Sequence, residues 1–137
     1  MEIIPVASIY VAGGLTLLLA VLHCRFYSMF GWAEAFSQIS PLNARILYTI
    51  HLALLLLFFV LGAISIGFAG ELSRARGLAL AIDGLLSLFW LWRLVWQLIY
   101  FKRGPRQRIP PVAIFLISVF FLLFVAYGVP VAWRCLV

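Results

Sequence analysis

The sequence predicts an all-α integral membrane protein, built as a single four-helix bundle whose helices run antiparallel, up-down-up-down. Of its 137 residues, 66% are hydrophobic and only 10% are charged, whereas about a quarter of the residues of a soluble domain are charged. Four apolar runs, each long enough to cross a bilayer, take up nearly the whole chain. Because they leave no room for a soluble catalytic domain, we expect one membrane domain over residues 1–137.

The first apolar run predicts a membrane helix over about residues 3–24. No charged residue lies between Glu2 and Arg25, and the run is long enough to span the hydrocarbon core. The next segment, residues 25–40, has the aromatic composition of a membrane interface. We therefore expect it to lie along the interface as a loop that includes a short helix.

A proline-led helix is predicted for the second span. Ser40 suits an N-cap and Pro41 suits the first helical position, which predicts a helix over about 41–69. The following apolar run predicts a third span over about 78–101. Because the connection between these two spans is short, we expect them to pack as antiparallel neighbours.

The fourth span is predicted over about 110–133, after a basic loop at residues 102–109. Cytoplasmic loops carry an excess of Lys and Arg, and this loop would attract anionic lipid rather than nucleic acid. Its side of the membrane holds six cations and the opposite side holds three: Arg25, Arg45, Lys102, Arg103, Arg106 and Arg108 against Arg74, Arg76 and Arg134. We therefore expect a multi-pass protein of the bacterial inner (plasma) membrane, with both termini outside the cytoplasm.

The third span carries a polar face that a simple membrane anchor does not need. Arg93 lies deep in the span, where a charged side chain is costly unless it faces protein, water or a ligand. At 100° per residue, Gln97 and Tyr100 fall on the same face, with Trp90 and Trp96 on its flanks. This face combines a cation, an amide and aromatic rings.

Asp83 lies toward the opposite end of the third span. It precedes Arg93 by ten residues, and that spacing corresponds to about 15 Å of helix. The two side chains therefore cannot pair directly. We expect Asp83 to lie close to the outer interface and to meet Arg74, Arg76 or water.

Both histidines of the chain are predicted to lie at the level of Arg93. His23 ends the first span and His51 lies near the start of the second, and a single loop joins these two ends. We therefore expect the histidines, Arg93 and Gln97 to converge at one level of the bundle. The candidate ligand-binding residues are Arg93, Gln97, His51, His23, Tyr48, Trp90, Trp96 and Tyr100.

This convergence allows three interpretations. Two imidazoles on neighbouring helices could ligate the iron of haem b, with an arginine meeting a propionate. They could instead hydrogen-bond a quinone or a lipid head group, with tryptophans against a flat ring. In the third interpretation, each histidine makes only a structural hydrogen bond. No other metal site is predicted, because no carboxylate or cysteine pair stands at ligand spacing.

The favoured function is a non-catalytic membrane subunit or accessory protein. It would contact the lipid bilayer and other membrane subunits or a second copy, and would hold a lipid or quinone-like ligand at the Arg93 face. The alternatives are a haem-b-binding electron-transfer anchor and a small proton-coupled transporter or channel. An enzyme is not favoured, because the sequence has no nucleophile with an attendant base, no phosphate loop and no HExxH helix.

Two motifs resemble those of a widespread group of small bacterial four-span proteins. They are Pro41-Leu42-Asn43 with Arg45 and His51, and Phe89-Trp90 with Arg93, Gln97 and Tyr100. The similarity covers about half of the chain, from Ser40 to Phe101. The resemblance implies that the polar face is shared by the group, and it implies no activity. The fourth span lacks the further histidine expected in that group.

Overall fold

The computed structural model is all-α and describes residues 3–100 and 110–136, among which no strand occurs. Four helices are long and apolar enough to cross a membrane, which makes the protein a multi-pass helical membrane bundle. Two short helices complete it. In chain order the helices are α1 (Ile3–Met29), α2 (Trp32–Ser37), α3 (Pro41–Gly67), α4 (Ala69–Leu72), α5 (Leu78–Tyr100) and α6 (Pro111–Leu136). Glu2 and the predicted basic loop at 102–109 lie outside the described residues.

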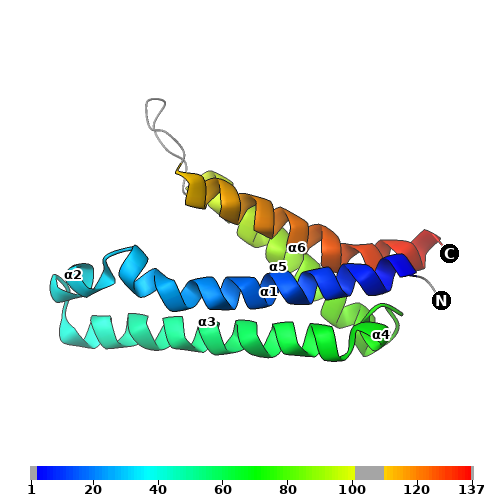
Figure 1. Cartoon of the computed structure of the whole chain (residues 1–137), viewed down its shortest axis with the longest axis horizontal. Helices are drawn as coiled ribbons and strands as arrows, with labels where there is room; N and C mark the ends of the chain where they lie inside the picture. Colours follow the sequence, from blue (N-terminus) through cyan, green and yellow to red (C-terminus); the bar gives the residue numbers. More distant parts are fainter. Residues whose placement is uncertain (1–2, 101–109, 137) are drawn as a thin grey trace.

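The four long helices form two pairs. α1 packs along α3, α5 packs along α6, and α6 joins the pairs by packing against α1. Figure 1 shows that the pairs lie close together near the chain termini and separate toward α2. The bundle is therefore two helical hairpins that meet at one end, which we call the closed end, and splay apart at the other, which we call the open end.

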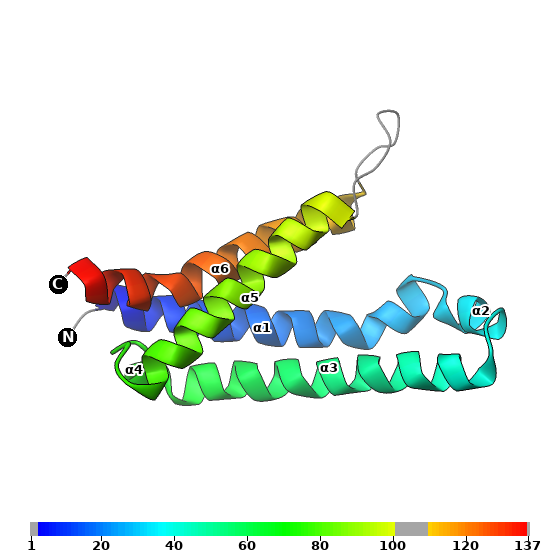
Figure 2. The same ribbon diagram turned by 180° about the vertical axis from the view of Figure 1, so that it is seen from behind.

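The expected packing of the second span against the third is wrong. Figure 2 shows that α5 leaves α3 at α4 and then runs along α6. The turn is sharp because Ala75 and Gly77, between α4 and α5, adopt positive φ angles of 44° and 54°. Large side chains bridge the wider gap that results, and the rings of Phe58 on α3 and Trp90 on α5 lie 5.8 Å apart between centroids.

α1 ends later than predicted, whereas the predicted start of α3 is confirmed. α1 continues past Cys24 to Met29, because a helix needs no apolar residues once it leaves the hydrocarbon core. Gly31 follows with a φ of 62°, a left-handed conformation that suits glycine at this turn. At the start of α3, the Ser40 hydroxyl accepts from the Asn43 N–H at 3.3 Å, as an N-cap does.

Small residues allow α1 and α3 to approach closely at the closed end. A Cβ added at Gly13 would lie 2.7 Å from a side-chain carbon of Ile66, and one added at Gly62 would lie 2.7 Å from Leu17. Small residues at a helix interface are typical of close packing in membranes, where dispersion contacts replace the hydrophobic effect. The core of the bundle accordingly lies at this end.

Candidate ligand-binding site

The gap between the two hairpins at the open end holds two adjacent cavities, which we call together the lateral cavity. The larger, of about 710 Å³, is lined by residues of α1, α2, α3, α5 and α6 and of the segment just before α6. The smaller, of about 520 Å³, lies against the buried aromatic side chains of α3, α5 and α6. Five residues line both: His23, Phe26, Leu54, Arg93 and Leu116.

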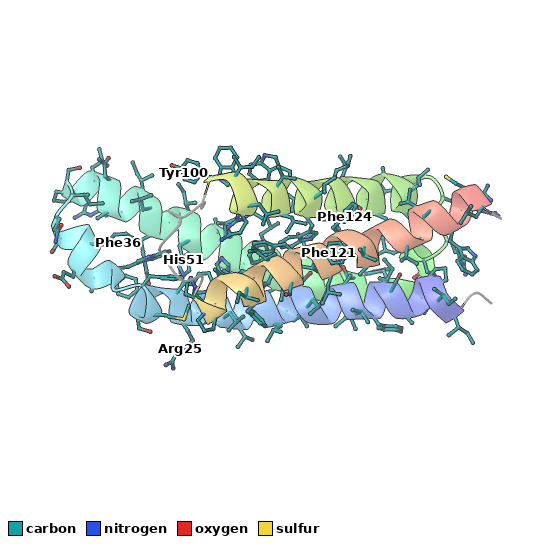
Figure 3. All side chains as sticks on the ribbon, turned by 90° about the horizontal axis from the view of Figure 1, so that it is seen from above. Arg25, Phe36, His51, Tyr100, Phe121 and Phe124 are labelled. Atoms are coloured by element: carbon teal, nitrogen blue, oxygen red, sulfur yellow. The ribbon has the colours of Figure 1, made fainter. Side chains whose placement is uncertain are left out.

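The two histidines lie side by side in this wall. The rings of His23 and His51 are 5.6 Å apart between centroids, with an interplanar angle of 14°. The Nδ1 of His23 lies 3.0 Å from the carbonyl oxygen of Leu19. Because a carbonyl can only accept, Nδ1 carries the proton and the lone pair of a neutral ring is on Nε2. Figure 3 shows His51 pointing into the space between α3 and α1, whereas Arg25 points away from the bundle.

Arg93 reaches inward from α5 toward α6. Its Nη1 donates to the Oε1 of Gln97 at 3.0 Å, and its guanidinium carbon lies 4.7 Å from the centroid of the Phe120 ring. The hydrogen bond orients the guanidinium, and the ring contact is a cation–π interaction. Because Gln97 uses its oxygen as the acceptor, the remaining polar group of that buried amide is a donor.

The strongest hydrogen-bond donor of the lateral cavity is the guanidinium of Arg93. The charged or titratable side chains of the cavity are Arg93, His23 and His51, and no Asp or Glu is among its described lining residues. The rest of the lining is almost entirely apolar or aromatic. The cavity therefore suits a ligand that combines an apolar body with an acceptor-rich head.

Trp90 forms the deep wall of the smaller cavity. It is only 1% exposed, and its ring packs between Phe58 at 5.8 Å and Phe120 at 5.6 Å. Its Nε1 is buried and has no hydrogen-bond partner among the described residues. An unsatisfied buried N–H costs about 1–3 kcal/mol.

Six of the eight predicted site residues line the lateral cavity, and two do not. His23, His51, Arg93, Gln97, Trp90 and Trp96 are among the lining residues. Tyr48 is 44% exposed, and its ring packs against that of Tyr27 with 5.8 Å between the centroids. Tyr100 is 68% exposed at the end of α5, where it stacks on Trp96.

The aromatic residues of α2 close one side of the cavity, a role that the sequence analysis missed. Trp32 and Phe36 belong to the segment predicted to lie along the membrane interface, and both line the larger cavity. The edge of Trp32 meets the ring of His51 at 4.8 Å, and Phe36 stacks on Trp32 at 5.5 Å. Their spacing of four residues, which puts them on one face of a helix, is the signal that could have predicted it.

The prediction that Asp83 meets Arg74, Arg76 or bulk water is wrong, whereas its level relative to the outer interface stays a prediction. Asp83 is 0% exposed, and neither carboxyl oxygen has a hydrogen-bond partner within the described residues. α5 packs against α6 and α4 at the closed end, and this packing encloses the side chain before it can reach a basic residue.

No family model matches this chain, and comparisons with curated proteins and with solved structures find no match. The resemblance to small bacterial four-span proteins therefore remains a prediction from the motif residues. The function has to be argued from the geometry of the cavity.

Proposed function

We propose that this small membrane protein is a non-catalytic accessory subunit that holds a lipid or quinone-like amphiphile in the lateral cavity. The observation that carries the proposal is the composition of the lining. Arg93 and Gln97 supply hydrogen-bond donors, and the two histidines supply imidazole nitrogens, to a cavity that is otherwise almost entirely apolar. Its larger part, at about 710 Å³, lies within the range of about 300–1,000 Å³ typical of ligand sites.

The head of the ligand would lie at Arg93. A guanidinium recognises carboxylate and phosphate through parallel hydrogen bonds, and imidazole and indole N–H groups suit single carbonyl oxygens. A lipid phosphate or the carbonyl oxygens of a quinone both meet this requirement. A cationic head would not, because no carboxylate stands among the described lining residues.

The body of the ligand would lie between aromatic rings and extend toward the bilayer. Phe30, Trp92 and Trp96 line the cavity and are also exposed on the surface of the bundle. The cavity therefore opens laterally, between helices whose outer surfaces face acyl chains. An amphiphile could enter from the membrane without crossing a polar barrier.

Copurification tests the proposal. The wild-type protein and an Arg93→Gln variant are purified in mild detergent, and bound lipids and quinones are extracted and quantified by mass spectrometry. Losing a hydrogen bond to a charged group costs about 1.5–3 kcal/mol, so we expect roughly ten- to hundredfold weaker retention in the variant. The matched control is Arg74→Gln, which changes an exposed arginine outside the cavity lining and should retain the ligand.

Two outcomes would contradict the proposal. One is a wild-type protein that carries no amphiphile above the level of the bulk membrane extract. The other is an Arg93→Gln variant that retains the same molecule in the same amount.

The histidine pair supports a second candidate, a haem-b-binding electron-transfer anchor. The hydrogen bond from His23 to Leu19 directs its protonated nitrogen away from a ligand and leaves Nε2 able to bind iron. His51 stacks beside it with 5.6 Å between the ring centroids, and both line the cavity, so binding of haem would require the rings to turn until each presents a nitrogen to the iron. Protein expressed with ample haem should then show a Soret band that His51→Ala abolishes, and a wild-type protein without the band would remove this candidate.

A further inference from the structure

A second buried polar cluster lies at the closed end, away from the lateral cavity. Each of the four long helices contributes to it. The hydroxyls of Ser65 and Tyr127 lie 2.7 Å apart, Ser87 donates to the Phe124 carbonyl at 3.0 Å, and Thr16 donates to the Ala12 carbonyl at 2.8 Å. Each of these hydroxyls therefore has a partner. We call Asp83 and the four residues that carry these hydroxyls the carboxyl cluster: Thr16, Ser65, Asp83, Ser87 and Tyr127.

Asp83 is the member of this cluster without a partner. It is fully buried and both of its carboxyl oxygens lack a hydrogen bond among the described residues. An isolated ionised carboxylate in such a place costs many kcal/mol, and the usual outcome is that the group becomes neutral. A neutral carboxylic acid needs only one acceptor for its O–H.

Among the described residues, no basic side chain forms a hydrogen bond with Asp83. The titratable side chain that shares the cluster with it is Tyr127 of α6, whose hydroxyl lies 2.7 Å from that of Ser65. α1 and α3 contribute the hydroxyls of Thr16 and Ser65 to the cluster. The charged groups in and just after α4 are Glu71, Arg74 and Arg76, all of which are exposed.

α6 offers an acceptor in the same region. Pro130 lies inside α6 and has no N–H, so the carbonyl of Ala126 lacks its usual donor from the next turn. Both residues are buried. The bond from Ser87 to the Phe124 carbonyl sets the register of α5 on α6, so that Asp83, one turn away, lies level with this part of α6. A protonated carboxyl would supply the donor that this region lacks, whereas a carboxylate would add a further acceptor.

We propose that Asp83 is a proton-binding site inside the membrane, where its carboxyl carries a proton at neutral pH. Intramembrane carboxyls of this kind are typical of proton relays. The site is separate from the lateral cavity. Trp90 forms the deep wall of that cavity and follows Asp83 by seven residues, which corresponds to about 10 Å of helix. The proposal therefore does not rest on the amphiphile and can fail or succeed independently of it.

Isotope-edited infrared spectroscopy tests the proposal directly, because Asp83 is the only aspartate of the chain. The whole protein is produced with and without ¹³C at the side-chain carboxyl of aspartate, and both samples are reconstituted in liposomes. Near neutral pH, we expect the difference spectrum to contain the C=O stretch of a protonated carboxylic acid. An exposed aspartate is ionised at this pH and would show a carboxylate band instead.

Variants test whether the acid band comes from Asp83, and salts test whether the site binds sodium instead of a proton. Asp83→Asn, which resembles the neutral acid in shape, should fold and lose the acid band, whereas Glu71→Gln should keep it. The isotope label gives the answer without any variant if Asp83→Asn does not fold. A labelled wild-type protein that shows only a carboxylate band near neutral pH would overturn the proposal. Conversion of the acid band to a carboxylate band by sodium chloride, but not by choline chloride, would also overturn it, in favour of a sodium site.

Discussion

The two ends of the bundle have the same apolar character, but the helices pack closely at one end and surround a cavity at the other. At the closed end, small residues such as Gly13 and Gly62 bring α1 and α3 together, and even Asp83 is completely enclosed. At the open end, aromatic side chains such as Phe26, Trp32 and Phe36 fill the space between elements and surround a cavity. Because lipid offers little hydrophobic driving force between helices, the size of the interface residues decides where the helices can meet.

The polar groups follow the same division. Arg93 and the two histidines lie at the open end and line the lateral cavity, and no acid accompanies them among the described lining residues. The carboxyl cluster lies at the closed end, among hydroxyls that already have partners. Trp90 lies between the two regions, and its ring packs against α3 and α6 at once.

Removal of the Trp90 side chain should have the largest effect on this arrangement. We expect Trp90→Ala to lower the free energy of unfolding by about 3–5 kcal/mol, because it replaces a fully buried ring by a void between the two hairpins. Unfolding in mixed micelles, followed by circular dichroism, measures this change. Trp92→Ala is the control, since Trp92 is exposed on the same helix, and an equal loss of stability in both variants would contradict the assigned role of Trp90.

Overpacking the closed end should be the next most damaging change. Gly13→Leu is expected to destabilise the protein by about 1–3 kcal/mol, because its first side-chain atom would already lie 2.7 Å from Ile66. Gly14→Leu provides a matched control, since a Cβ added at Gly14 meets nothing within 4 Å. The same unfolding assay measures both variants. Equal destabilisation by Gly13→Leu and Gly14→Leu would contradict the close packing assigned to the closed end.

Removal of the indole nitrogen of Trp90 alone should have a smaller effect, which concerns retention of the ligand. Trp90→Phe keeps most of the ring packing and removes the unsatisfied N–H. If that N–H binds a ligand oxygen, retention of the amphiphile should fall by a factor corresponding to about 1 kcal/mol, roughly fivefold, with little loss of stability. Quantitative mass spectrometry of the bound lipid or quinone measures it. Undiminished retention would show that the head group does not reach this donor.

The smallest expected effect concerns one hydrogen bond of the carboxyl cluster. Ser65→Ala removes the 2.7 Å contact with the Tyr127 hydroxyl. Interhelical hydrogen bonds in membranes are worth about 0.6 kcal/mol on average, so we expect a change of that size in the free energy of unfolding. Ser118→Ala, on an exposed face of α6 where the hydroxyl bonds within its own helix, should have no measurable effect.

The elements of the fold could be predicted because they depend on local properties. The length of each apolar run, the absence of charge between Glu2 and Arg25, and the Ser40-Pro41 start of α3 all act within a few residues. The meeting of the two histidines also has a local cause, because one short connection joins the ends of α1 and α3. The direction in which the third span leaves α4 has no such local signal.

What the amino-acid sequence determined by itself is a membrane protein of four spans with a cation, an amide and two histidines near one level. Only the tertiary structure decided that the hairpins separate around those groups, that α2 covers them and that Asp83 is enclosed without a hydrogen-bond partner among the described residues. The physical reason is that spans follow from hydrophobicity along the chain, whereas cavities and buried charges follow from how closely residues far apart in sequence can pack.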